Sequence, residues 1–225
     1  MPPIKSAALA LGVSLSLAGP LAGLAVAQGQ GHGGHGAAHG AMPAASAGAQ
    51  TPAARELEAA NAKMHKDMSI ALTGNADVDF ARGMVPHHQG AIDMAEIVLR
   101  HGSDATIRKL ANEIIGAQRK EIAQLRAWLE KNGNAPAGAD AQAVRAAFAD
   151  ANAKMHKDMT MTFTGRADVD FARGMIPHHE GAIEMARLFQ RYGKDAELRA
   201  LADDIIRTQN EEIGVLRDWL KRNGA

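Results

Sequence analysis

The chain contains the same stretch twice. Residues 61–133 match residues 152–224 at a constant offset of 91, and 45 of the 73 positions are identical. Identity is concentrated in two segments: NAKMHKDM, which opens each copy, and ADVDFARGM[VI]PHH[QE]GAI[DE]MA, which starts at Ala76 and at Ala167. Elsewhere the copies diverge but keep their apolar positions. Two copies of one unit predict a fold with approximate internal two-fold symmetry.

Each copy is predicted to form three helices. In the first copy they are expected at about 55–72, from Asp77 or Asp79 to Gly102, and over 103–133, with capping residues and glycines at their ends. Apolar residues recur with the helical period, and no stretch alternates with a period of two. The short loop between the second and third helices makes them an antiparallel pair. We therefore expect an all-α fold, an antiparallel four-helix bundle from two similar repeats, with the first helices as additional helices packed on it.

The N-terminal region is expected to lie outside this bundle. Residues 1–27 are typical of a signal peptide, because an apolar run follows Lys5 and a small-residue cleavage site ends at Ala27. An uncleaved membrane anchor is the alternative. Residues 28–54 form a His/Gly/Ala-rich tail predicted to be disordered, either a loose metal-collecting segment or a plain linker. The remaining parts are a first helical repeat (55–133), a connector (134–140) and a second helical repeat (141–225). The predicted localisation is periplasmic or secreted.

Cysteine is absent from the chain, and the formal charges balance to zero. Without thiolates there is no disulfide, no thiol catalysis and no cysteine-based zinc or iron–sulfur site. Without a basic surplus or a block of charge, we expect no nucleic-acid partner and, once the signal peptide is removed, no membrane contact. Any soft metal would have to use methionine sulfur and histidine nitrogen.

Methionine and histidine gather on the inward faces of the predicted helices. At about 100° per residue, Met84, the His87-His88 pair and Met94 share the apolar side of the second helix. In the first helix, an M-H-x-x-M pattern places two methionines one turn apart with a histidine beside them. The candidate metal ligands are Met64, His65, Met68, Met84, His87, His88 and Met94 in the first copy, and Met155, His156, Met159, Met175, His178, His179 and Met185 in the second.

This donor set suits a soft cation. Thioether sulfur is a soft, neutral donor and imidazole is borderline, so the combination favours Cu(I), or Ag(I), over zinc or iron. Methionines at helical spacing are also common in ordinary cores. Two adjacent inward histidines are harder to accommodate there, since each buried ring nitrogen needs a partner. Whether the copies make two sites or one shared site stays open.

Catalytic alternatives fit the residues less well. A di-iron centre needs inward carboxylates and a glutamate three residues before a histidine, but Met84 and Val85 occupy those positions in the first copy. A hydrolase with a His/Asp pair would need a serine nucleophile, which the motif shared by the two copies lacks. Asp93 also points away from the histidines. Asp79 and Asp170 could support metal ligands or cap their helices, and we favour the capping role. We therefore expect the protein not to be an enzyme.

The motif D-F-A-R-G-M-[VI]-P-H-H-[QE]-G-A-I-[DE]-M-A, which starts at Asp79 and at Asp170, resembles the signature of a bacterial secreted family, the domain of unknown function 305. The resemblance covers about 55–225, as two tandem copies. It implies a ferritin-like four-helix bundle without the usual di-iron ligands. Some relatives are periplasmic copper- or silver-binding proteins with methionine and histidine ligands, which implies the same role for the matching residues here.

Together these patterns predict an exported metal-binding protein that holds copper, with Cu(I) favoured, for sequestration, resistance or delivery. Its expected partners are metal ions and a copper-delivery protein, and a homo-oligomer is compatible with the sequence. The alternative is a structural or interaction bundle whose histidines and methionines simply fill the core. A metal-dependent redox enzyme is a third option, which the missing carboxylates disfavour.

Overall fold

The computed structural model describes residues 51–225, which form six α-helices and contain no β-strand. The predicted signal peptide (1–27) and residues 28–50 of the predicted tail lie outside the described residues. The helices are α1 (Pro52–Asp67), α2 (Ala76–His101), α3 (Ala105–Asn132), α4 (Ala141–Asp158), α5 (Ala167–Tyr192) and α6 (Ala196–Arg222). None of these six is long and apolar enough to cross a membrane. The prediction of an all-α bundle is confirmed.

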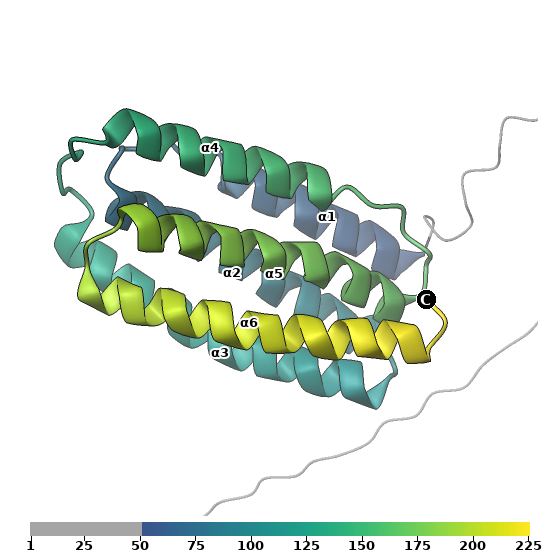
Figure 1. The fold of residues 1–225 in the computed structure, drawn as a ribbon. Coiled ribbons are helices and arrows are strands. Elements are labelled where there is room, and N and C mark those ends of the chain that lie inside the picture. Colours follow the sequence, from purple (N-terminus) through teal and green to yellow (C-terminus); the bar gives the residue numbers. More distant parts are fainter. Residues whose placement is uncertain (1–50) are drawn as a thin grey trace, which may run out of the picture. The chain divides into compact units, whose positions relative to one another are not determined.

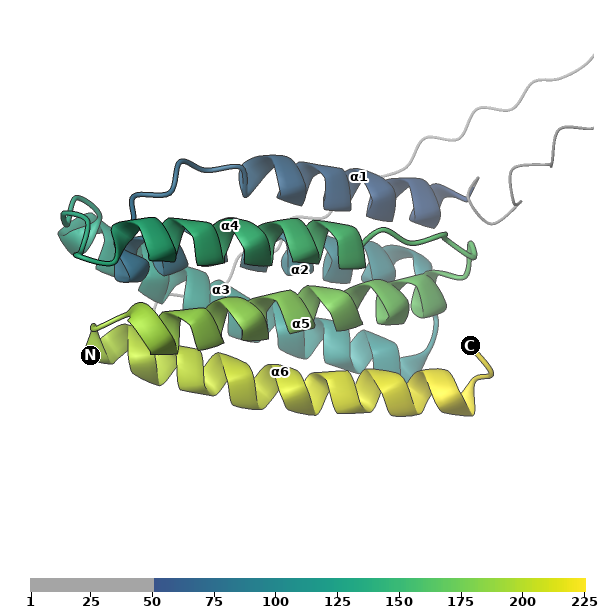
Figure 2. The ribbon, with the colours of Figure 1, turned by 45° about the horizontal axis from the view of Figure 1, so that its top comes forward.

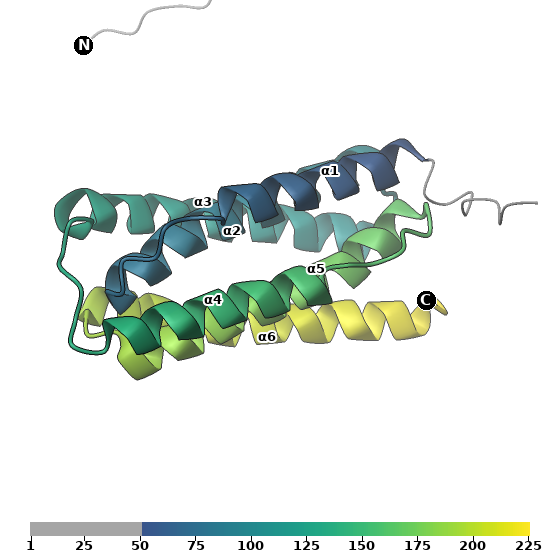
Figure 3. The same ribbon diagram turned by 90° about the horizontal axis from the view of Figure 1, so that it is seen from above.

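The helices are arranged in three layers (Figure 1). α2 pairs with α3, α5 pairs with α6, and α2 lies against α5, so these four helices make the bundle. α1 packs mainly on α2, and α4 mainly on α5. Figure 2 shows α1 and α4 as an outer layer over α2 and α5, and Figure 3 looks onto that layer. The two copies therefore supply equivalent halves, and α2 and α5 form the central layer.

Glycines let α2 and α5 approach closely. A Cβ placed on Gly83 would lie 2.9 Å from the Cε of Met185, and one placed on Gly174 would lie 3.0 Å from the Cε of Met94. Both methionines are buried. Each methionine side chain therefore packs directly on the backbone of the neighbouring helix. Because an early residue of one helix faces a late residue of its neighbour, the two helices run antiparallel.

The helix boundaries differ from expectation around the loop before α2. α1 ends at Asp67 rather than near 72. α2 begins at Ala76, and its N-cap is Asn75, not Asp77 or Asp79 as predicted. The Asn75 side chain accepts hydrogen bonds from two first-turn amides of α2, which is the usual role of an N-cap residue.

Asp79 has a different role from the predicted cap. Its buried carboxylate accepts hydrogen bonds from the amide and hydroxyl of Thr73, at 2.7 and 2.8 Å, and from the amide of Gly74, at 2.8 Å. Gly74 has a φ of 82°, a left-handed conformation that favours glycine. Asp170 makes the same three bonds to the loop before α5. These aspartates therefore hold the loop that lets each outer helix fold back on the central layer.

The first-turn aspartates connect the two copies. Asp77 of α2 accepts hydrogen bonds from the amides of Lys194 and Asp195, at 2.8 and 2.9 Å, just before α6. Asp168 of α5 accepts one from the amide of Ser103, at 3.0 Å, just before α3. Each copy thus fixes the start of a helix in the other.

Replacing Asp79 with alanine should lower the free energy of unfolding by roughly 2–4 kcal/mol, because buried loop donors lose their acceptor. Urea unfolding followed by circular dichroism measures this change. Asp150→Ala, at an exposed position of α4, is the control and should change stability by less than about 0.5 kcal/mol. Equal losses in both variants would contradict the role given to Asp79.

Candidate metal centre

The two histidines of each pair point in different directions, because adjacent residues on a helix are about 100° apart. His87 reaches from α2 toward α5, where its ring centroid lies 3.9 Å from that of His178. His88 reaches toward α3, where its Nε2 lies 2.8 Å from Oε2 of Glu121. The second copy repeats this division. The first histidine of each pair therefore meets its counterpart where the two copies join, and the second does not.

His87 and His178 are fully buried. The Nε2 of His178 lies 3.1 Å from the carbonyl oxygen of His87. A carbonyl only accepts, so this nitrogen carries the proton and Nδ1 of neutral His178 has the lone pair. Within residues 51–225, that Nδ1 and both ring nitrogens of His87 have no hydrogen-bond partner. Buried polar atoms without partners are rare and costly, so these nitrogens fit the donor atoms of a metal site.

A second pair of histidines joins α1 to α4. The ring centroids of His65 and His156 are 3.7 Å apart. The Nδ1 of His65 is buried, and no residue of the described chain forms a hydrogen bond with it. Each of these rings follows a methionine that lies on the central layer, Met64 before His65 and Met155 before His156.

Two methionines complete this group. Met64 of α1 lies over Gly90, where a Cβ would come within 2.5 Å of its sulfur. Met155 of α4 lies over Gly181. A Cβ on Gly181 would be 2.9 Å from Met155 Sδ and 3.4 Å from His87 Nε2. The bare glycine backbone therefore brings a thioether of the second copy close to an imidazole of the first.

We call these six residues the central cluster: Met64, His65, His87, Met155, His156 and His178. The cluster draws on α1, α2, α4 and α5 and on both copies. In the described part of the chain, no three His, Asp or Glu side chains are placed to hold one metal ion between them. A metal in the central cluster would therefore need thioether sulfur beside imidazole nitrogen, which suits a soft cation.

The imidazoles of the central cluster are held in their neutral form. Burial, and to a smaller extent the neighbouring histidines, keeps the pKa values of His87 and His178 well below their usual range. Burial and then His156 lower the pKa of His65 to about 4, and burial lowers the pKa of His156. A neutral imidazole is the form that binds a metal.

Other predicted ligands lie apart from the central cluster. Met94 and Met185 pack on the glycines of the α2–α5 interface, where the Cε of Met94 lies over Gly174, about one turn before His178. Met84 and Met175 are fully buried in the same core. Met68 and Met159 are the buried C-cap residues of α1 and α4.

Two glutamates beside the histidines were not among the predicted site residues. Glu121 of α3 and Glu212 of α6 place their Oε2 atoms 2.8 Å from the Nε2 of His88 and His179. Each glutamate side chain is less than one-fifth exposed although it sits on a helix that is polar outside. The available signal was that both are identical between copies and lie one turn after the conserved pair of glutamines at 118 and 209. These contacts give each Nε2 a carboxylate neighbour, but within residues 51–225 the buried Nδ1 atoms of His88 and His179 have no hydrogen-bond partner.

The chain matches one family model, described as a domain of unknown function, over residues 77–220. This range covers more than half of the chain and includes α2 to α6 almost completely. α1, with Met64 and His65, lies before it. A curated relative, the uncharacterized protein L153 of Acanthamoeba polyphaga mimivirus, is 34% identical over 55 residues. That match spans 24% of this chain and only 36% of the mimivirus protein.

Several solved structures are similar to the chain. CopM in a silver-bound form is 34% identical, with a TM-score of 0.50, and the match covers 65% of this chain and 95% of CopM. CopM in its Cu(I)-bound form is 32% identical, with the same TM-score, over 65% and 96% of the two chains. A secreted protein of this domain type from Streptomyces coelicolor is 25% identical, with a TM-score of 0.55, over 68% and 96%. The chain belongs to the family of proteins built on the domain of unknown function 305.

Proposed function

We propose that this protein binds copper as Cu(I), or alternatively Ag(I), in the central cluster, and thereby sequesters the metal or delivers it to another protein. The observation that carries the proposal is the group of buried imidazole nitrogens at His87 and His178 for which residues 51–225 offer no hydrogen-bond partner. From the outer layer, Met155 lies beside His87 across Gly181, and Met64 takes the equivalent position over Gly90. The proposal makes one centre that both copies share.

The donor types support this choice of metal. Cu(I) and Ag(I) accept both thioether and imidazole ligands, whereas calcium and magnesium favour oxygen ligands. Zinc shares the imidazole ligands with copper, so the two thioethers are the donors that favour the softer cations. Among solved relatives, CopM has forms bound to Ag, to Cu(I) and to Cu(II), at 30–34% identity to this chain. The similarity to CopM supports metal binding here, and the residues of this chain support the softer oxidation state.

The proposal has three further parts. The protein is exported to the periplasm or secreted, since residues 1–27 have a signal-peptide pattern. It contains two tandem copies of one ancestral unit, which the offset of 91 supports. It is not an enzyme, because the donor set stabilises a soft cation and offers no acid–base pair beside it.

Replacing His87 and His178 together with glutamine should weaken Cu(I) affinity by about 100-fold or more, since even residues that only support metal ligands contribute about 10- to 100-fold. Competition with a chromophoric Cu(I) chelator measures the affinity. The matched variant is His88→Gln with His179→Gln, which alters the adjacent positions and should leave affinity within about tenfold of the wild type. Circular dichroism checks that both variants remain helical.

A larger loss in the His88/His179 variant than in the His87/His178 variant would contradict the choice of ligands. A wild-type protein that binds neither Cu(I) nor Ag(I) would contradict the function itself. The histidines would then belong to a bundle with a structural or interaction role.

Replacing Met64 and Met155 with leucine should lower the affinity for Ag(I) and Cu(I) by roughly tenfold or more, because the thioethers are lost while side-chain volume is kept. Met94→Leu with Met185→Leu is the control. Those two residues pack on Gly174 and Gly83 and are not members of the central cluster, so metal affinity should not change. A volume-conserving exchange should cost less than about 1.5 kcal/mol of stability per site. Isothermal titration with Ag(I) and thermal unfolding provide the two measurements. An equal loss of affinity in both variants would show that Met64 and Met155 are not special.

A further inference from the structure

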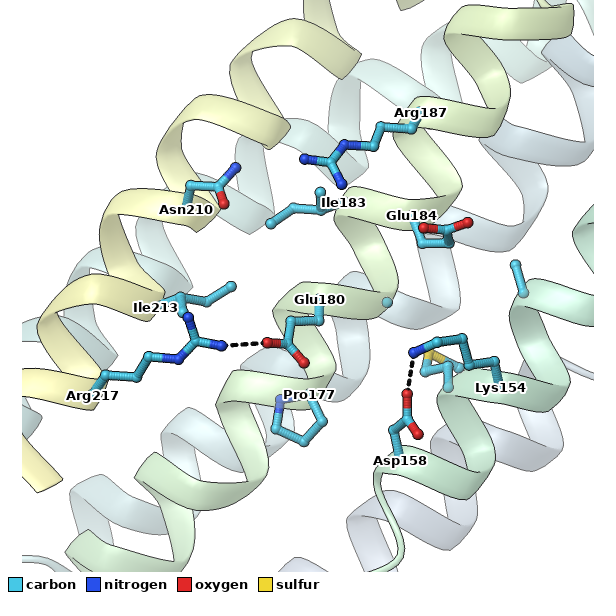
Figure 4. A pocket seen from close by; sticks show the side chains of 13 residues that line it. Lys154, Asp158, Pro177, Glu180, Ile183, Glu184, Arg187, Asn210, Ile213 and Arg217 are labelled. Atoms are coloured by element: carbon cyan, nitrogen blue, oxygen red, sulfur yellow. Dashed lines mark hydrogen bonds and ion pairs between the residues drawn. The ribbon is translucent and has the colours of Figure 1, made fainter.

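One pocket of the described chain reaches the central cluster from outside. It has a volume of about 280 Å³ and lies between α4, α5 and α6 (Figure 4). Its rim consists of exposed side chains, among them Lys154, Glu180 and Asn210. Its inner wall includes Met155 and Gly181. The pocket therefore ends at a member of the central cluster.

Gly181 both lines the pocket and lies next to His87. It has no side chain, and a Cβ there would touch Met155 Sδ at 2.9 Å and His87 Nε2 at 3.4 Å. His87 itself is fully buried, and in residues 51–225 its Nε2 has no hydrogen-bond partner. A cation that enters the pocket would thus meet the Met155 sulfur first and the His87 nitrogen just behind it.

The matching groove of the first copy holds a pocket of the same volume, about 280 Å³, with a different lining. Its pocket between α2 and α3 is lined by Gln89, Ile92, Glu96, Arg119, Ile122, Ala123 and Arg126, and so does not extend to Met64 or Gly90. Arg119 and Glu96 form an ion pair at 2.8 Å that joins α3 to α2 across this groove. Asn210 and Arg187 occupy the same positions in the second copy and cannot form such a pair. The two grooves therefore differ in what they reach: the second is lined by a member of the central cluster, and the first is not.

The charges around the open pocket are largely neutralised in pairs. Arg217 donates to Glu180 at 2.6 Å, and Lys154 is paired with Asp158 (Figure 4). A highly charged cation gains little from such a rim, whereas a soft monovalent cation gains from the thioether at the inner end. The chemistry of the pocket thus agrees with that of the central cluster.

We propose that the central cluster is loaded and unloaded through this pocket, on the α4–α5–α6 side, and that Met155 is the first ligand to contact the incoming Cu(I) or Ag(I). This inference rests on the proposed function. It assigns different roles to the two copies: both supply ligands, but only the second provides access.

The test compares rates with affinity. Asn210→Trp fills the mouth of the pocket, and Asn210→Arg with Arg187→Glu installs the ion pair of the first copy. Cu(I) is supplied as a chelator complex and later removed by excess chromophoric chelator, in a range where the rate no longer depends on chelator concentration. Both loading and unloading should slow by at least about fivefold, with their ratio, and so the equilibrium affinity, unchanged.

Arg119→Trp, at the matching position of the first copy, is the control and should leave both rates as in the wild type. If Asn210→Trp fails to fold by circular dichroism, the Asn210→Arg/Arg187→Glu variant decides the question. Unchanged rates in the pocket variants, or equal slowing in the Arg119→Trp control, would overturn the inference while leaving the proposed function intact. Absence of equilibrium Cu(I) and Ag(I) binding in the wild type would instead overturn the proposed function.

Discussion

The close approach of α2 and α5 is the contact on which the rest of the structure depends. Glycines at 83 and 174 allow methionine side chains to lie directly on the opposite backbone, and Phe80 stacks on Phe189 with ring centroids 4.5 Å apart. Apolar burial at this interface stabilises the two central helices. It also brings His87 and His178 into contact, although burying their polar ring nitrogens away from water costs free energy. The interface that forms the core therefore also creates a set of buried, neutral imidazoles.

The outer helices turn this interface into a site. Asp79 and Asp170 hold the loops that fold α1 and α4 back over α2 and α5, and the glycines at 90 and 181 make room for the methionines that descend from those helices. A methyl group at either glycine would collide with a thioether. Close packing, loop geometry and the placement of the candidate ligands thus depend on the same few positions, which are identical in the two copies.

Much of the fold could be predicted from the sequence, because helical periodicity and the repeat are local or directly visible patterns. The Asp79 role was predicted wrongly, since an aspartate near a helix start is usually a cap and nothing local shows that it faces a preceding loop. The partners of His88 and His179 were also missed. In the sequence, Glu121 cannot be distinguished from the exposed charged residues of its helix. Only the packing of α3 against α2 shows that it faces inward.

The sequence by itself determined the helical class, the duplication and the donor types: methionine and histidine in the absence of cysteine. It also identified every residue of the central cluster among its candidates, because helical spacing tells which side chains face inward. Only the tertiary structure decided which of those inward residues meet. Neighbours such as His87 and His88 differ by about 100° in direction, so one reaches the partner copy and the other reaches α3. Which histidine meets its counterpart depends on the register between α2 and α5, which are 91 residues apart in the sequence. No local sequence pattern predicts that register.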